Sequence, residues 1–259
     1  MVENEIELSY EDLVNRDVIE AWVTLNCVSN PVGGELVGNA WWSGVKLSTI
    51  LAEAKPLDGA TAVLQTSDDG WNCATPIEAL TDDRNAMLAV AMNGEPLPIE
   101  HGYPVRTIVP GLYGYVSATK WVVDMEVTTF EDVDAYWTQR GWGEFGPVKM
   151  ASRIEVPSQG DDLAAGDVVI AGTAWSQHTG ISGVEVAVDG QGWVPAELGE
   201  SVTIDSWVQW RAVVSVTAGN HIVGARAIDN NGLVQTSAIA DVLPDGATGL
   251  HAVEFSASA

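Results

Sequence analysis

Few side chains in this sequence could carry redox or metal chemistry. Its 259 residues include two cysteines and four histidines. Cys27 follows the alternating run VIEAWVTLN and precedes a loop rich in Asn, Pro and Gly. A thiolate held at the end of a strand can bind a soft metal, whereas a lone cysteine is more often a small buried side chain. The residues around Cys27 leave both interpretations open.

The composition argues against several classes of site and partner. The sequence has no C-x-x-C, H-E-x-x-H or paired-histidine spacing, so a zinc site is not expected. Acidic residues outnumber basic ones by 36 to 11, giving a net charge of −25. Such a chain is not expected to bind nucleic acid or anionic lipid. The acidic surface fits a protein that works in high salt or an ordinary acidic bacterial protein, and both remain open.

Up to about residue 145, helical and strand-like stretches alternate. SYEDLV predicts a helix capped by Ser9, with Asp12 at its third position, and a strand leads from there to Cys27. WWSGVKLSTILAEAKP predicts a turn and then a helix that ends before Pro56. TAVLQTS and NAMLAVAMNG predict strands, the second closed by an Asn-Gly turn. VRTIVPGLYGYVSATKWVVDMEVTTF predicts two more strands around a Gly-rich bend. We therefore expect an α+β domain over residues 1–148.

The remainder, residues 149–259, has the pattern of an all-β sandwich. Its segments VVIAGTAW, VEVAVDGQGWVPAEL, WVQWRAVVSV, NHIVGARAIDNNG and VQTSAIADV are short, alternating and separated by Gly, Asn and Asp turns.

Several ordered motifs resemble the molybdopterin-dependent sulfite oxidase family. AMNGEPLPIEHGYPVRTIVPG matches the family's run NG-x-PL-x-x-x-HG-[FY]-P-x-R-x-x-VPG. LNCVSN matches the segment that carries the molybdenum-ligating cysteine, and WWSGVKLSTIL matches its W-x-G-V-x-L helix start. GTAWS and the strands after it are similar to the family's immunoglobulin-like dimerisation domain. The resemblance covers nearly the whole chain and is strongest to the bacterial and archaeal branch.

The resemblance implies Mo-molybdopterin as the cofactor and gives roles to several residues. It implies that Cys27 is the metal ligand, while Cys73 has no such context and is interpreted as structural. His101, Arg106 and Lys120 lie in the motif that binds the cofactor. The Gly-rich bend before Ser117, Ala118 and Thr119 could present amides to the pterin phosphate. Asp69 is a further candidate contact, for which Asp68 or Ser67 are alternatives. On their own residues, His101 could equally be an ordinary loop histidine and Arg106 a surface ion pair.

Departures from the family pattern concern the substrate. Family members that oxidise sulfite carry an arginine shortly after the cysteine, where this chain has Pro31 and Val32. Trp142 stands at the position of an active-site tyrosine, and the expected C-terminal arginine has no counterpart. Arg140 and Arg153 are possible substitutes, and we count Arg153 and Trp142 as candidate catalytic residues. The implied reaction is oxygen-atom transfer to or from a small oxyanion or sulfoxide-like substrate, with sulfite in doubt.

The resemblance also bears on partners, compartment and completeness. It implies a homodimer through the C-terminal sandwich. Without a C-x-x-C-H haem motif, electrons would pass to a separate partner or membrane module. Family members of this branch usually work outside the cytoplasm, although these residues contain no export signal. The family domain begins before the equivalent of Met1, so we expect this chain to hold only part of it. The alternative is a non-catalytic assembly or dimerisation protein that retains the sandwich.

Overall fold

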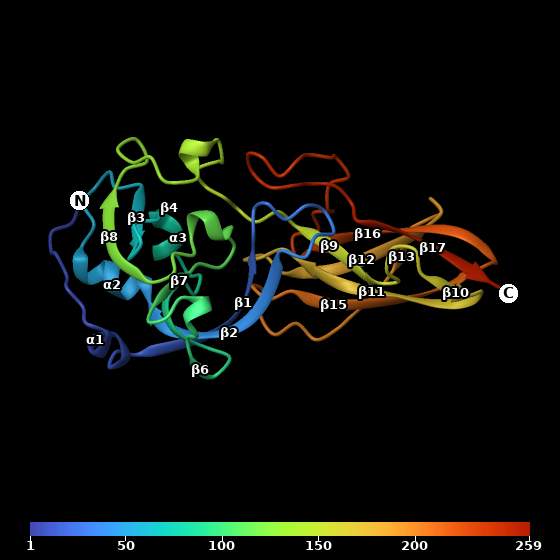
Figure 1. The fold of residues 1–259 in the computed structure, drawn as a ribbon, viewed down its shortest axis with the longest axis horizontal. Coiled ribbons are helices and arrows are strands. Elements are labelled where there is room, and N and C mark those ends of the chain that lie inside the picture. Colours follow the sequence, from blue (N-terminus) through green and yellow to red (C-terminus); the bar gives the residue numbers. More distant parts are fainter. The chain divides into compact units, whose positions relative to one another are not determined.

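The computed structural model describes residues 1–259, which divide into two compact units (Figure 1). The first unit comprises Met1–Val28, Gly38–Pro147 and Leu243–Asp245. The second unit comprises Ser29–Val37, Val148–Val242 and Gly246–Ala259. Both units consist mainly of strands, with short helices only in the first.

The elements of the first unit follow one another as α1 (Tyr10–Val14), β1 (Val18–Asn26), β2 (Val37–Lys46), α2 (Leu47–Ala54), β3 (Ala62–Ser67), β4 (Asn72–Pro76), α3 (Ile77–Thr81), β5 (Met87–Met92), β6 (Glu95–Pro96), η1 (Ile99–His101), β7 (Arg106–Ile108), η2 (Gly114–Val116), β8 (Val122–Thr128) and η3 (Thr138–Arg140). The unit is therefore the mixed domain expected from the sequence, but its α-helices are short and strands dominate.

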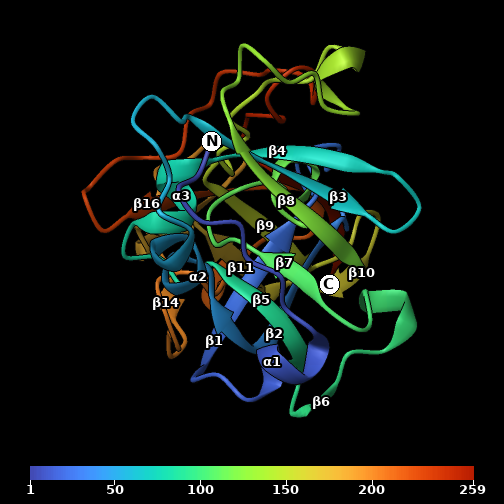
Figure 2. The same ribbon diagram turned by 90° about the vertical axis from the view of Figure 1, so that its left-hand side faces the viewer.

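Two sheets build the first unit (Figure 2). One has the order β1-β2-β5-β6, with β7 also paired to β5, and the other has the order β4-β3-β8. Residues of β1, β2, β5 and β7, including Val23, Trp42, Met87 and Ile108, pack into one buried cluster. Because β1 contributes to this cluster, its C-terminal end is firmly held by the sheet.

Local sequence signals explain several of these elements. Ser9 and Asp12 form a capping box that starts α1, as predicted. Asn93 and Gly94 adopt positive φ values of 55° and 82° after β5, which is the backbone that an Asn-Gly hairpin turn requires. Lys55 ends α2 in a left-handed conformation just before Pro56.

The prediction of a turn at WWSGVK was wrong, because these residues form the second half of β2 and pair with β5. Gly44 is the misleading signal. A β-carbon there would lie 2.2 Å from the carbonyl oxygen of Leu88. The glycine thus permits a close approach of two strands at a register shift instead of forming a turn.

The second unit contains strands only, namely β9 (Ala151–Val156), β10 (Asp162–Ala164), β11 (Gly166–Trp175), β12 (Ile181–Val188), β13 (Val194–Pro195), β14 (Glu197–Leu198), β15 (Val208–Val216), β16 (Gly219–Asp229) and β17 (Ala252–Ser258). They form two sheets with the orders β10-β17-β16-β12-β13 and β14-β15-β11-β9. Inward residues of both sheets, such as Ile170, Trp210, Val223 and Phe255, share one hydrophobic core.

The predicted strand VQTSAIADV is absent from the second unit. This stretch makes only isolated bridges, between Val234 and Ile228 and between Ala240 and Thr248. Its residues are exposed except for the half-buried Val242 and the buried Gln235, whose side chain bonds to the backbone of Ala227 and Gly249. With a single bridge to β16 and no continuous buried face, the alternating pattern does not produce a strand here.

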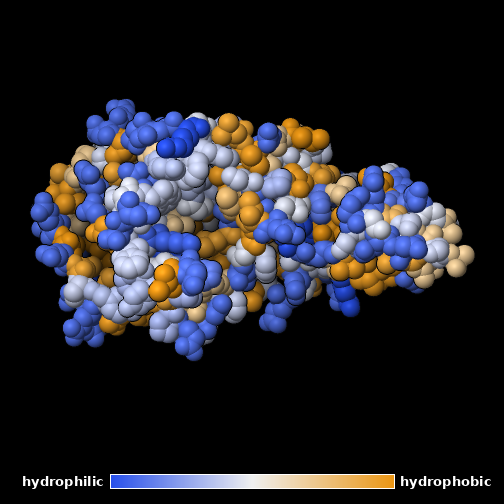
Figure 3. Space-filling view, viewed as in Figure 1, coloured by the Kyte–Doolittle hydropathy of each residue, from blue (hydrophilic) through white to orange (hydrophobic).

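The surface is mixed in hydropathy. Hydrophilic residues cover much of the face seen in Figure 3, with smaller hydrophobic patches between them. None of the helices is long and apolar enough to cross a membrane.

Because the second unit has one shared core, truncating a buried isoleucine should lower its free energy of unfolding more than truncating an exposed one. Ile170 is fully buried, whereas Ile222 on β16 is 44% exposed. Replacing Ile170 with Ala should destabilise the second unit by about 2–5 kcal/mol, because it removes buried methyl groups and leaves a cavity. Ile222→Ala is the matched control and should cost much less. Scanning calorimetry measures both shifts, and equal shifts would contradict the core assignment.

Candidate functional site

Cys27 lies directly after β1 and its side chain is exposed. Ala21, Val23 and Leu25 pack into the cluster that contains Trp42. Strand alternation continues from them to Cys27, so the thiol is expected on this face of the sheet. Its neighbour Asn26 is buried, and its side-chain oxygen has no hydrogen-bond partner. The strand thus ends in an accessible thiol, and the unpartnered oxygen of Asn26 lies on the opposite face of the strand.

Arg106 and Lys120 form a pair of cations. The two residues are bridge partners, Arg106 on β7 and Lys120 just before β8. The Arg106 guanidinium is buried, donates to the carbonyl of His101 at 3.0 Å and has its centre 5.0 Å from the centroid of the Trp42 ring. The Lys120 ammonium donates to the carbonyl of Glu100 at 2.7 Å. Neither cation has a carboxylate partner, so their positive charges are not neutralised by the protein.

The pKa values reflect this environment. Burial lowers the pKa of Arg106 to about 10. The pKa of Lys120 is also lowered, first by burial and then by the positive charge of Arg106. A bound anion would relieve both effects, because an opposite charge favours the protonated forms.

The carbonyl groups that hold the two cations come from η1, which Gly102 ends. Gly102 has a φ of 104°, which favours glycine. A β-carbon at this position would lie 3.0 Å from the Lys120 β-carbon and 3.2 Å from that of Arg106. The glycine of the HG motif therefore lets η1 lie close to the cation pair. His101 contributes its backbone carbonyl to this arrangement, and its side chain is exposed.

The segment Ser117–Lys120 is arranged differently from the expectation that its first three amides face a phosphate. The amides of Ser117 and Ala118 both donate to the carbonyl of Gly114. The amide of Thr119 donates to the hydroxyl of Thr107 at 2.8 Å. These three amides already donate within the protein. The Lys120 ammonium is therefore the group in this segment that could still donate to an anion.

Asp69 lies in the turn between β3 and β4, where its carboxylate accepts the amide of Trp71 at 3.0 Å. The amide of the adjacent Asp68 donates to the carbonyl of Trp121 at 3.0 Å. This turn therefore lies beside the residue that follows Lys120. Asp69 is thus one residue from this backbone contact, and its carboxylate is already bonded locally.

Trp142 packs between Tyr115 and Trp137, with ring centroids 5.9 Å and 6.5 Å away. An indole can donate a hydrogen bond but cannot exchange a proton as a phenol can. The nearby Arg140 has its guanidinium centre 3.7 Å from the centroid of the Tyr136 ring. This aromatic group supplies shape and a cation–π contact.

Arg153 belongs to the second unit and lies on β9. Its guanidinium pairs with the carboxylate of Glu155 and donates to the carbonyl of Gly34 at 2.9 Å. Its charge is therefore already balanced within its own unit.

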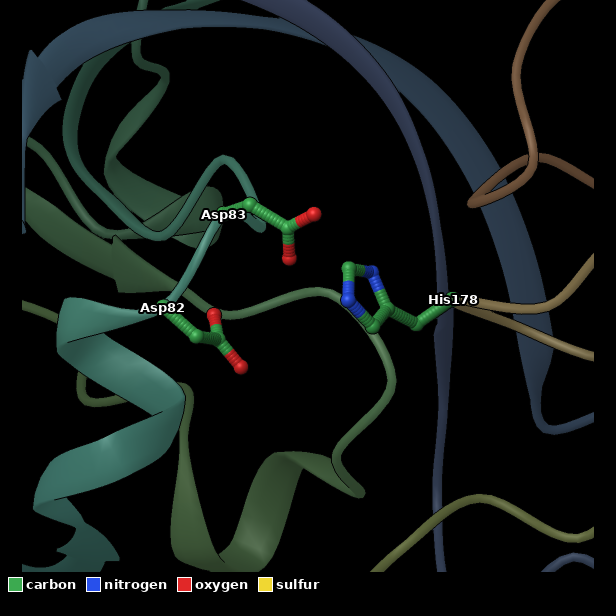
Figure 4. Close-up of side chains that lie close together, drawn as sticks. All are labelled: Asp82, Asp83 and His178. Atoms are coloured by element: carbon green, nitrogen blue, oxygen red, sulfur yellow. The ribbon is translucent and has the colours of Figure 1, made fainter.

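Figure 4 draws three further titratable side chains, Asp82, Asp83 and His178. Asp82 and Asp83 follow α3 in the first unit, and Arg84 donates to the Asp82 carboxylate at 2.9 Å. His178 lies between β11 and β12 in the second unit. We assign these residues no common site because they belong to different units.

Two residues of the site were missed by the sequence interpretation. Trp42 stacks against Arg106, and Asn26 carries a buried oxygen without a partner next to Cys27. Trp42 occurs in the motif WWSGV, where an aromatic side chain signals only burial. Its contact with Arg106 depends on the pairing of β2 and β7 through β5.

The family model for the oxidoreductase molybdopterin-binding domain matches residues 1–137 of the chain. The chain belongs to this family. The first unit is therefore related to domains that bind molybdopterin. The sequence prediction of a sulfite-oxidase-type molybdopterin domain is confirmed.

Known relatives agree with this membership. Mitochondrial sulfite oxidase of Homo sapiens is 28% identical over 92% of this chain and 52% of its own length. The uncharacterized oxidoreductase YuiH of Bacillus subtilis is 31% identical over 55% of this chain and 68% of its own length. The sulfane dehydrogenase SoxCD of Paracoccus pantotrophus has a similar fold, with a TM-score of 0.79 and 24% identity over 91% of this chain and 67% of its own. The chain spans about half the length of the human enzyme.

The two thiols of this molybdopterin-domain protein should differ sharply in reactivity. Burial raises the pKa of the Cys73 thiol to about 12, and its sulfur lies 3.2 Å from the Thr119 hydroxyl. At pH 8 Cys73 is therefore almost entirely in the unreactive thiol form. In cofactor-free protein, iodoacetamide should modify Cys27 alone under native conditions and both cysteines in denaturant. Peptide mass spectrometry makes the measurement, and native modification of Cys73 would contradict it.

Proposed function

We propose that this chain is part of a molybdenum-dependent oxidoreductase of the sulfite oxidase type. It would transfer an oxygen atom to or from a small oxyanion or sulfoxide-like substrate. The observation that carries the proposal is the cation pair of Arg106 and Lys120, which lacks a carboxylate partner and belongs to the same unit as the accessible Cys27.

Mo-molybdopterin fits the residues that are present. The Cys27 thiolate would ligate the metal, since soft thiolates suit molybdenum in a sulfur-rich environment. Arg106 and Lys120 would hold the pterin phosphate, the first through its fork of N–H donors and the second as a point charge. Trp42 and Arg106, which are in contact, each retain a buried polar atom without a partner, which is consistent with a polar ligand beside them. When bound, the cofactor would supply the two-electron oxygen-atom transfer.

Other candidate residues would contribute less directly. His101 would contribute through its carbonyl to Arg106, and Ser117, Ala118 and Thr119 would form the rigid wall that carries Lys120. Asp69 would stand at the edge of the pterin site. Trp142 would shape the substrate pocket by packing, because it cannot act as a proton donor and acceptor in turn.

The substrate is proposed to carry less negative charge than sulfite. A small dianion needs cationic partners when it is desolvated. Pro31 and Val32 replace the expected arginine, Arg140 is stacked on Tyr136, and Arg153 is paired with Glu155. These pairings favour a monoanionic or sulfoxide-like substrate. As the family resemblance implies, electrons would pass to a separate carrier protein or membrane module outside the cytoplasm.

The domain assignment follows from the same proposal. Residues 1–148 would bind molybdopterin, and residues 149–259 would form an immunoglobulin-like dimerisation domain. The two sheets that share one core in the second unit support a sandwich of this kind. Val169 and Val213 are cross-strand partners that are 49% and 59% exposed, which offers apolar surface for a second copy.

Metal analysis tests the cofactor assignment. Protein expressed with molybdenum and pterin supply should contain molybdenum, and Cys27→Ser should reduce the metal content at least about tenfold because it removes the soft ligand. Cys73→Ser is the matched control and should retain the metal. Wild-type protein without molybdenum would contradict the proposal and favour the non-catalytic assembly protein. An unchanged molybdenum electron paramagnetic resonance signal in Cys27→Ser would contradict only the role of the cysteine.

Analytical ultracentrifugation tests the dimer. The full chain should sediment as a dimer at micromolar concentration, and Val213→Glu should raise the dissociation constant because it buries a charge against the partner. Gln209→Glu adds the same charge on the same strand and serves as the control. A monomer at every concentration would rule the dimer out.

A further inference from the structure

Two like charges held side by side are unfavourable, so the protein must fix the backbone that carries them. Arg106 and Lys120 are bridge partners without a carboxylate between them. Their separation is set by the segments on which they lie, β7 and residues 117–120. The contacts behind these segments therefore decide whether the cation pair keeps its geometry.

Thr107 and Thr119 join the two segments immediately behind the cations. The Thr107 amide donates to the Thr119 carbonyl at 2.9 Å. In return, the Thr119 amide donates to the Thr107 hydroxyl at 2.8 Å. Side chains of adjacent residues in extended backbone point to opposite faces. The buried threonines therefore face inward, while Arg106 and Lys120 lie on the opposite face.

Gln65 on β3 anchors this pair of threonines to the other sheet. Its side-chain oxygen accepts the Thr107 hydroxyl at 2.6 Å, and its side-chain nitrogen donates to the Thr75 hydroxyl at 2.6 Å. Thr75 in turn donates to the carbonyl of Val116, one residue before Ser117. Gln65, Thr75, Thr107 and Thr119 are all fully buried. The chain of hydrogen bonds thus starts at Thr119, in the segment that carries Lys120, and ends at Val116, directly before that segment.

The direction of every bond in this chain is determined. The Val116 carbonyl can only accept, so the Thr75 hydroxyl must donate to it and must accept from the Gln65 nitrogen. The Thr119 amide can only donate, so the Thr107 hydroxyl accepts from it and gives its own proton to the Gln65 oxygen. A carboxylate at position 65 could not donate to the Thr75 hydroxyl, and an apolar side chain there could bond to neither threonine. A buried network that is fully satisfied in one arrangement favours a single local structure.

We propose that Thr107 and Gln65 are positioning residues that hold Arg106 and Lys120 together as a preorganised site for an anionic group. The inference rests on the proposed function, since that anion is the phosphate of the cofactor. Thr107 acts through the Thr119 backbone, and Gln65 acts by fixing the Thr107 hydroxyl and the Val116 carbonyl. Neither side chain touches the anion.

Thr107→Val and Thr107→Ser form the matched pair that tests the inference. Valine keeps the shape of threonine but removes the hydroxyl, whereas serine keeps the hydroxyl. Inorganic phosphate is titrated into the cofactor-free full chain at constant ionic strength and followed by calorimetry. Thr107→Val should weaken phosphate binding at least about fivefold, which corresponds to the loss of one buried hydrogen bond. Thr107→Ser should bind within about twofold of the wild type. Thr128→Val, at a buried threonine of β8, controls for the general effect of this substitution and should also bind normally.

A second readout separates positioning from a purely structural role. The Lys120 ammonium is titrated by NMR through its ε-carbon. In Thr107→Val its pKa should rise toward the ordinary lysine value, because Lys120 becomes less buried and is no longer held beside Arg106. A merely destabilising substitution would lower the melting temperature without moving this pKa or the phosphate affinity, and that result would overturn the inference.

Two further variants keep the test decisive. If Thr107→Val does not fold, Gln65→Met takes its place, since it keeps the side-chain length but loses both hydrogen bonds; it should weaken phosphate binding similarly. Lys120→Met should abolish phosphate binding. If Lys120→Met binds phosphate normally, the proposed anion site itself is wrong. If Lys120→Met fails to bind while Thr107→Val and Gln65→Met bind normally, only the positioning role is wrong.

Discussion

A buried guanidinium without a carboxylate is the constraint on which the first unit depends. Arg106 is 4% exposed, and its side chain meets a backbone carbonyl and an indole ring. Burying a charge in this way is unfavourable unless the charge is later compensated. The second cation, Lys120, increases the need for compensation instead of meeting it. This uncompensated positive charge is the basis for the proposal that the first unit binds an anionic group.

The two sheets of the first unit hold this arrangement from behind. Gln65 lies in the β4-β3-β8 sheet and bonds to Thr107, which lies on β7 of the other sheet. Gly102 brings the carbonyl groups of η1 close to both cations. An electrostatically unfavourable pair thus rests on a neutral, fully bonded framework. The same principle explains preorganised anion sites generally, in which the scaffold is stabilised elsewhere so that the site need not reorganise.

The second unit follows a simpler logic. Its inward residues alternate along each strand and share one core, so hydrophobic burial is the main source of its stability. Its only candidate for chemistry, Arg153, is neutralised by Glu155. The family membership covers residues 1–137 only, so it relates the first unit to molybdopterin-binding domains and leaves the role of the second unit to the proposal above.

Local patterns in the sequence were sufficient for much of the fold. The capping box at Ser9, the Asn-Gly turn after β5 and the alternating strands of the second unit depend on residues close in the chain, and they were predicted correctly. Ordered motifs also identified the family, and the proposed site residues Cys27, Arg106 and Lys120 come from the same motifs. Gly44 and the stretch VQTSAIADV misled the prediction because their conformation depends on distant strand partners. The bridge between Arg106 and Lys120, the stacking of Trp42 and the bonds of Gln65 were decided only by the tertiary structure. These contacts join residues that are far apart in sequence, and neither hydrophobic period nor motif spacing carries information about which distant side chains will meet.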